Sequence, residues 1–100
     1  MQEFLHLKEK ALLKYIANHY KRTLEVQFTL FTINHTTVFI NDFTTISVEN
    51  LAELYNLLTS LMIRNYICFD EKRGIDTFLG VEITLTEKAL NFFNSGKPIR

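Results

Sequence analysis

Apolar residues recur at helical spacing in three separate segments, so the fold of this chain must contain helices. The segments cover residues 4–20, 47–65 and 84–95, and residues typical of strands prevail between them. A chain of 100 residues, 47% of them hydrophobic, can build one core. We therefore expect one α+β domain over residues 1–100 with three or four helices. Because Ser95-Gly96 stops the last helix and Pro98 prevents its resumption, a short mobile tail is expected from about residue 96 to 100.

The first segment predicts an amphipathic helix from Phe4 to Tyr20. Its apolar stripe consists of Leu5, Leu12, Leu13, Ile16, Ala17 and Tyr20. Lys21 and Arg22 follow in the last turn, where a cation complements the partial negative charge of a helix C-terminus. We expect these two cations to cap and solvate the helix.

Residues 24–46 allow two interpretations. Alternation at Leu24, Val26, Phe28 and Leu30 favours a strand, and Thr36, Thr37, Val38 and Ile40 favour another, with Asn34-His35 as the turn. Leu24, Phe28 and Phe31 also share helical spacing, so a buried helix is the alternative. The sequence leaves both open.

Ser47 is the expected N-cap of the next helix, with Glu49 in its first turn and an end near Asn65. The buried stripe is expected at Leu51, Leu54, Tyr55, Leu58, Leu61 and Met62. The outward face is expected at Glu49, Asn50, Glu53, Asn56, Ser60 and Arg64.

An antiparallel hairpin is predicted between this helix and the last one. Residues 66–69 and 78–85 form its strands, and the charged segment 70–74, which ends in Gly74, forms its tip. Thr84 or Thr86 then caps the closing helix, since Thr84 with Glu87 has the spacing of a capping box and Thr86 is a simple N-cap.

The C-terminal half resembles a winged helix-turn-helix domain. Residues 47–67 look like a recognition helix that runs through Arg64-Asn65-Tyr66-Ile67 into the first wing strand. Residues 83–90 look like the start of the closing helix, with Ala89 where such families have Gly. Among winged helices, the small phage-associated YjcQ-type proteins are similar in pattern. The resemblance covers residues 47–95 and implies a winged-helix-like fold with an antiparallel β-hairpin wing.

This resemblance implies a small DNA-binding transcriptional regulator of bacterial or phage type, which acts by occupying its site on double-stranded DNA. A homodimer would match two half-sites. The residues expected to contact DNA are Asn50, Asn56, Ser60 and Arg64 on the helix, and Lys72 and Arg73 on the wing. The alternative is a non-enzymatic protein-interaction module on the same scaffold without DNA binding, which a surplus of Phe at residues 28, 31, 39, 43, 92 and 93 would serve.

Composition and the absence of known motifs limit the classes of function that we expect for this chain. Eleven basic and eleven acidic residues cancel, so nucleic-acid binding would need a local patch. His6, His19 and His35 lack the spacing of a helical metal pair, and no catalytic motif occurs, so we expect no enzyme, metal or cofactor. The lone Cys68 is expected to be a buried structural thiol. A charged N-terminus and the absence of a long apolar run favour a cytoplasmic protein without membrane spans.

Overall fold

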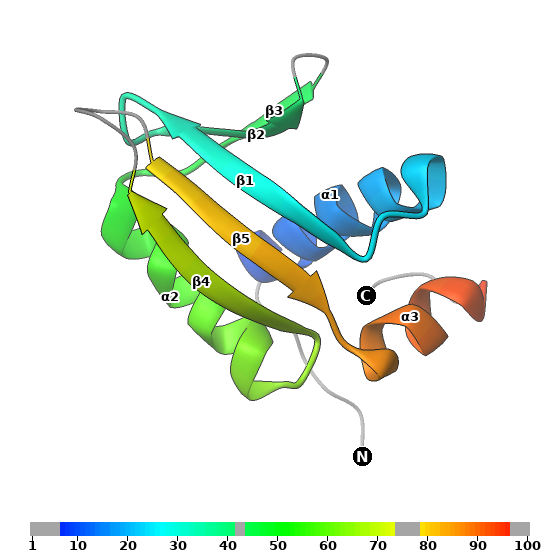
Figure 1. The fold of residues 1–100 in the computed structure, drawn as a ribbon. Helices are drawn as coiled ribbons and strands as arrows, with labels where there is room; N and C mark the ends of the chain where they lie inside the picture. The colour runs from blue at the N-terminus through cyan, green and yellow to red at the C-terminus, as the bar shows by residue number, and fades with distance from the viewer. Residues whose placement is uncertain (1–6, 42–43, 74–78, 97–100) are drawn as a thin grey trace.

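The computed structural model describes residues 7–41, 44–73 and 79–96. Within these ranges the chain alternates helices and strands in an α+β arrangement (Figure 1). The elements are α1 Leu7–Thr23, β1 Gln27–Ile33, β2 Thr37–Asn41, β3 Thr44–Ser47, α2 Leu51–Ile63, β4 Ile67–Arg73, β5 Leu79–Leu85 and α3 Glu87–Asn94.

The five strands form one antiparallel sheet in the order β3-β2-β1-β5-β4. Helices α1 and α2 lie behind this sheet in Figure 1, and α3 lies beyond the end of β5. The two long helices therefore cover the same face. Within the described ranges no helix covers the opposite face, which we call the open face.

The core lies between the sheet and α1 and α2. Alternate residues of β1 point into it, so that Phe28 and Leu30 are buried while Gln27 and Ile33 are exposed. From the helices, the fully buried side chains are Leu12, Leu13, Ile16, Leu54, Leu58 and Leu61. From the other strands, Val38, Ile67, Val81 and Ile83 complete this layer. A two-layer arrangement results, in which each helix buries one apolar stripe against the sheet.

The structure confirms the first helix. Leu12, Leu13, Ile16, Ala17 and Tyr20 are buried in α1 as the periodicity predicts, and Lys21 and Arg22 occupy its last turn. The helix ends when Leu24 adopts a positive φ of 60° and donates its N–H to the Tyr20 carbonyl. Phe4 and Leu5 lie outside the described residues.

The segment 24–46 forms strands, which decides between the two interpretations that the sequence leaves open. Asn34 and His35 form the predicted turn between β1 and β2, both with positive φ. A bulge then interrupts the β2–β3 ladder between Phe39 and Asn41. The freed N–H of Ile40 donates to the Tyr15 hydroxyl, and this hydroxyl donates to the Thr44 carbonyl at 2.6 Å. A residue of α1 thus fixes the outer end of the sheet.

The predicted end of α2 near Asn65 is confirmed, whereas its predicted N-cap is wrong. Ser47 closes β3, and the N-cap is Asn50, whose Oδ1 accepts from the Glu53 N–H at 2.9 Å. The helix ends at Ile63 with Arg64 as C-cap, since Asn65 adopts a positive φ of 66°. Ser47 cannot cap because it is engaged in the sheet ladder opposite Thr37. Met62, predicted to be buried, is 38% exposed.

The hairpin of β4 and β5 confirms the predicted antiparallel return, although its tip differs from the prediction. Residues 70–73 continue β4 in register with residues 79–82 of β5, so they form strand and not turn. Gly74 lies outside the described residues, as do residues 97–100 of the expected tail. Thr86 caps α3 by accepting from the Ala89 N–H, and Thr84 remains in β5. Gly96 follows the C-cap Ser95 with a φ of 74°.

The expected α+β class and the antiparallel hairpin are therefore confirmed. Residues 27–41 and 44–47 supply β1, β2 and β3, in the place where a helix-turn-helix would have its second helix. No helix among the described residues is long and apolar enough to cross a membrane.

Candidate functional site

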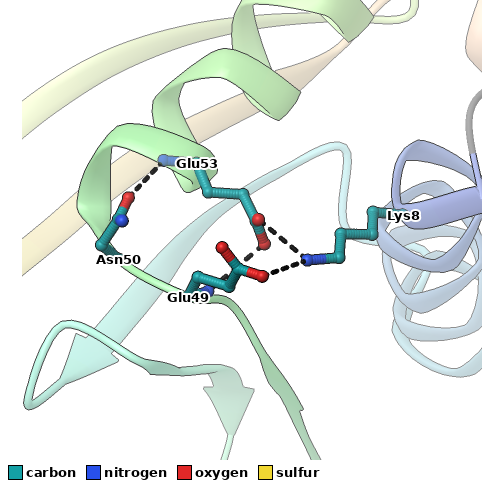
Figure 2. A network of polar contacts seen from close by, with 4 residues as sticks. All are labelled: Lys8, Glu49, Asn50 and Glu53. Carbon is teal, nitrogen blue, oxygen red and sulfur yellow. Dashed lines mark hydrogen bonds and ion pairs between the residues drawn. The ribbon is translucent and has the colours of Figure 1, made fainter.

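The residues predicted to contact DNA from α2 are mostly engaged inside the molecule. Asn50 caps α2, as described above, and the Glu53 carboxylate turns toward α1 (Figure 2). There the Nζ atom of Lys8 lies 2.8 Å from Oε2 of Glu53 and 3.6 Å from Oε1 of Glu49. The hydrogen bond with Glu53 raises the pKa of Lys8, and the same bond lowers the pKa of Glu53. This network ties the start of α2 to α1.

A second contact ties the end of α2 to the same helix. The Ser60 hydroxyl donates to Oε2 of Glu9 at 2.6 Å, and Nε of Arg64 lies 3.4 Å from that oxygen. The carbonyl of Arg64 accepts from Nζ of Lys88 at 2.7 Å. Ser60 and Arg64 were expected to face outward, but α1 packs along this side of α2. Of the residues predicted on this helix for DNA contact, Asn50 and Asn56 are exposed, and Asn50 uses its side-chain oxygen to cap the helix.

Lys72 and Arg73 lie near the end of β4, opposite Gly80 and Leu79 of β5. Only their backbone belongs to the described structure, which places both at an edge strand of the sheet. The predicted DNA-contacting residues are thus spread along α2 and at the end of β4. On α2, the described contacts bring Ser60 and Arg64 together, since both approach Glu9.

The open face is a surface that sequence reasoning did not identify. On β1 it carries Gln27, Thr29, Phe31 and Ile33, which alternate with the buried residues of the strand. Register extends this face to Thr37 and Phe39 on β2, to Thr45 and Ser47 on β3, and to Cys68, Asp70, Gly80, Glu82 and Thr84 on β4 and β5. The sequence predicts the alternation in β1. It does not predict which face of the sheet the helices leave uncovered.

Phe31 and Phe39 form the apolar centre of the open face. They are direct cross-strand partners, and their ring centroids lie 5.5 Å apart in a tilted arrangement. On its other side Phe31 pairs with Gly80 of β5, which has no side chain and is nevertheless buried. Thr45 of β3 lies opposite Phe39. The row Gly80, Phe31, Phe39 and Thr45 therefore crosses β5, β1, β2 and β3 without a charge, and its next register position, on β4, is Lys72.

The acidic side chains of the open face lie toward the other edge of the sheet. Asp70 and Glu82 are cross-strand partners on β4 and β5, and the Gln27 side-chain amide donates to Oε1 of Glu82 at 2.9 Å. Cys68 is exposed on this side, so the expectation of a buried thiol is wrong. The reason is strand parity, because Ile67 and Phe69 take the inward positions on either side of it.

His19 is a buried histidine, with 4% of its surface exposed. Its ring packs edge-on against Phe28 at 4.8 Å, and Nε2 lies 3.6 Å from Oε1 of Glu25. Burial lowers the pKa of this imidazole. Across residues 7–41, 44–73 and 79–96, no group of three histidine, cysteine or acidic side chains is arranged to hold a metal ion.

Comparison with protein-family models, curated proteins and solved structures finds no match to this chain. Its function therefore has to be inferred from the surfaces of the molecule itself.

Proposed function

We propose that this protein is a non-enzymatic protein-interaction module and that its partner is a second copy of the same chain, docked on the open face. The observation that carries the proposal is the Phe31–Phe39 pair on a sheet face that no described helix covers. Aromatic side chains are enriched at protein interfaces, because they bury a large apolar area at low entropic cost.

The charge distribution of the open face favours a second copy as the partner. All its described positions on β1, β2 and β3 are uncharged, although 22% of the chain is charged. Two such surfaces can meet without placing like charges together, whereas a strongly charged partner would find no complement there. Asp70 and Glu82 lie on β4 and β5, away from the aromatic pair. A twofold contact centred on the aromatic pair keeps them away from the axis.

The size of the face sets the expected strength of this dimer. Five strands at about 4.8 Å spacing and about 20 Å length present roughly 500 Å² per copy. Two copies would bury about 1,000 Å² in total, which is near the lower limit for a specific interface. We therefore expect a dimer that dissociates on dilution.

Sedimentation velocity across a range of concentrations tests this proposal. A single charge placed beside the aromatic pair, Thr45→Lys, should shift the equilibrium toward monomer, because a lysine ammonium would have to be buried at the contact. Thr45 is exposed, so the substitution should leave the fold intact. Ala52→Lys adds the same charge at an exposed position of α2 and should leave association unchanged.

Two results would overturn the homodimer. One is a monomer at every concentration up to about 500 µM, beyond which any association is too weak to be specific. The other is a dimer that Thr45→Lys leaves intact and Ala52→Lys disrupts, which would move the interface to the helical layer.

A second proposed function is the DNA-binding regulator on a winged-helix-like scaffold. The order α2, β4, β5, α3 supports it, because a recognition helix, a wing hairpin and a closing helix follow one another in that order in such domains. Exposed Asn56 is the remaining candidate for base contact on α2. Asn56→Ala should change sequence preference, whereas Arg73→Ala should weaken binding to all sequences alike; a site-selection experiment with both variants tests this.

A further inference from the structure

Helix α1 concentrates positive charge on one side of the molecule. It holds five of the chain's eleven basic residues and one of its eleven acidic residues. The single acid, Glu9, is turned toward α2 and engaged by Ser60 and Arg64. The net balance of the whole chain therefore hides a strongly polar distribution, with α1 basic and the remainder acidic.

Four of these cations share one face of the helix with an amide. Positions 10, 14, 18, 21 and 22 are Lys10, Lys14, Asn18, Lys21 and Arg22, and their spacing places them on one side of the helix. We call this set the basic stripe. All of its members except the half-buried Lys10 are exposed. At about 1.5 Å per residue the basic stripe is about 18 Å long.

The cations of the basic stripe are available to an external anion. Within the described residues none of them takes part in an ion pair, in contrast to Lys8 and Arg64. The carbonyls at this end of α1 are also partly satisfied, since Leu24 N–H donates to the Tyr20 carbonyl and Thr23 Oγ1 donates to the His19 carbonyl. The partial negative charge at this end of the helix is therefore smaller, and it repels an anion less.

A cleft lies beside the C-terminal half of the basic stripe. It is an open hollow of about 370 Å³, lined by Tyr15, Asn18, Lys21, Arg22 and Thr44. Two cations there accompany the Asn18 amide, and both are groups that proteins use to contact phosphate. The Tyr15 hydroxyl is not a free donor, because it already donates to the Thr44 carbonyl. The Asn18 amide therefore adds a hydrogen-bond donor where the basic stripe supplies charge.

We infer that the basic stripe binds the phosphate backbone of double-stranded DNA without reading its sequence. The inference rests on the second proposed function, DNA binding, and not on the homodimer; it moves the contact surface from α2 to α1. A duplex fits better than a single strand, because the stripe is straight and rigid and Tyr15, whose hydroxyl is engaged with Ile40 and Thr44, is not free to stack on bases.

Fluorescence anisotropy with a labelled random duplex, titrated from about 50 to about 200 mM salt, tests this inference. The double variant Lys14→Gln/Lys21→Gln should lower the affinity by between about tenfold and hundredfold and reduce the salt slope by about two. The matched control is Lys8→Gln/Lys88→Gln, which removes the same charge from two lysines that are already engaged within the protein. Circular dichroism of each variant establishes that the fold is retained.

The outcomes separate the inference from the function on which it rests. Loss of affinity and slope in the Lys14→Gln/Lys21→Gln variant, with the control variant unchanged, supports the basic stripe. Equal or greater loss in the control variant would show that the affinity follows net charge alone, which overturns the basic stripe but leaves DNA binding in place. Absence of binding by the unaltered protein at the lowest salt overturns both.

Discussion

The Ser60 hydroxyl on α2 donates a 2.6 Å hydrogen bond to the Glu9 carboxylate on α1. Glu9 is mostly buried at this contact, with 12% of its side chain exposed, and Arg64 approaches the same oxygen. A side chain expected at a DNA surface thus joins two helices. The contact replaces hydration that the carboxylate has lost.

Removal of this hydroxyl should destabilise the fold. Ser60→Ala leaves a part-buried carboxylate without one of its donors, and we expect a loss of about 1–2 kcal/mol in the free energy of unfolding. Asn56→Ala is the control on the same helix, where an exposed amide should matter by less than about 0.5 kcal/mol. Urea denaturation of both variants measures the difference. Equal stabilities would show that the hydroxyl contributes nothing.

The position of the α2 cap can be tested with a pair of substitutions. Asn50→Ala removes the side-chain acceptor of the Glu53 N–H and should cost about 1 kcal/mol. Ser47→Ala changes an exposed residue at the end of β3 and should cost less than about 0.5 kcal/mol. Thermal unfolding of both variants measures the two losses of stability. A larger loss for Ser47→Ala would show that Ser47 caps α2, as the sequence predicts.

The turn between β1 and β2 should tolerate a stabilising change. His35 has a φ of 63°, which is strained for any residue with a Cβ atom. His35→Gly relieves that strain and creates the Asn-Gly pair preferred in such turns, so we expect a gain of about 0.5–1 kcal/mol. His35→Val should lower stability instead, because a β-branched residue resists positive φ. Denaturant midpoints that rank Val above Gly would contradict this backbone conformation.

His19 should make stability depend on pH. Burial lowers the pKa of its imidazole, an effect that Arg22 reinforces and Glu25 opposes, so the unfolded chain binds a proton more readily than the folded one. The stability that His19 contributes is therefore fully present above its usual pKa near 6.5 and is lost as the pH falls below that value. One proton corresponds to a slope of at most about 1.4 kcal/mol per pH unit.

His19→Phe should flatten this dependence, since the replacement cannot take up a proton and keeps an aromatic ring beside Phe28. Free energies of unfolding measured from about pH 7 to about pH 5 test it. If the variant and the unaltered protein lose stability in parallel over that range, other groups account for the pH response.

The spacing of apolar residues by itself determined the helices and strands that depend on residues close together in the sequence. The three helices and the antiparallel hairpin follow from local spacing. The structure decided for strands around the Asn34-His35 turn and for Thr86 over Thr84 as the cap of α3, two choices that local spacing left open. Periodicity also separated a buried from a polar stripe on α1, because a helix next to one sheet has one apolar side.

Only the tertiary structure decided which polar side chains meet solvent. Glu53, Ser60 and Arg64 look outward on an isolated helix, but α1 packs beside α2 and engages them through Lys8 and Glu9. Cys68 looked like a core residue within an apolar run, yet strand parity turned it to the open face. Asn50, and not Ser47, caps α2, because Ser47 belongs to β3 and pairs with β2. In each case the deciding partner is distant along the chain, and spacing within one segment carries no information about it.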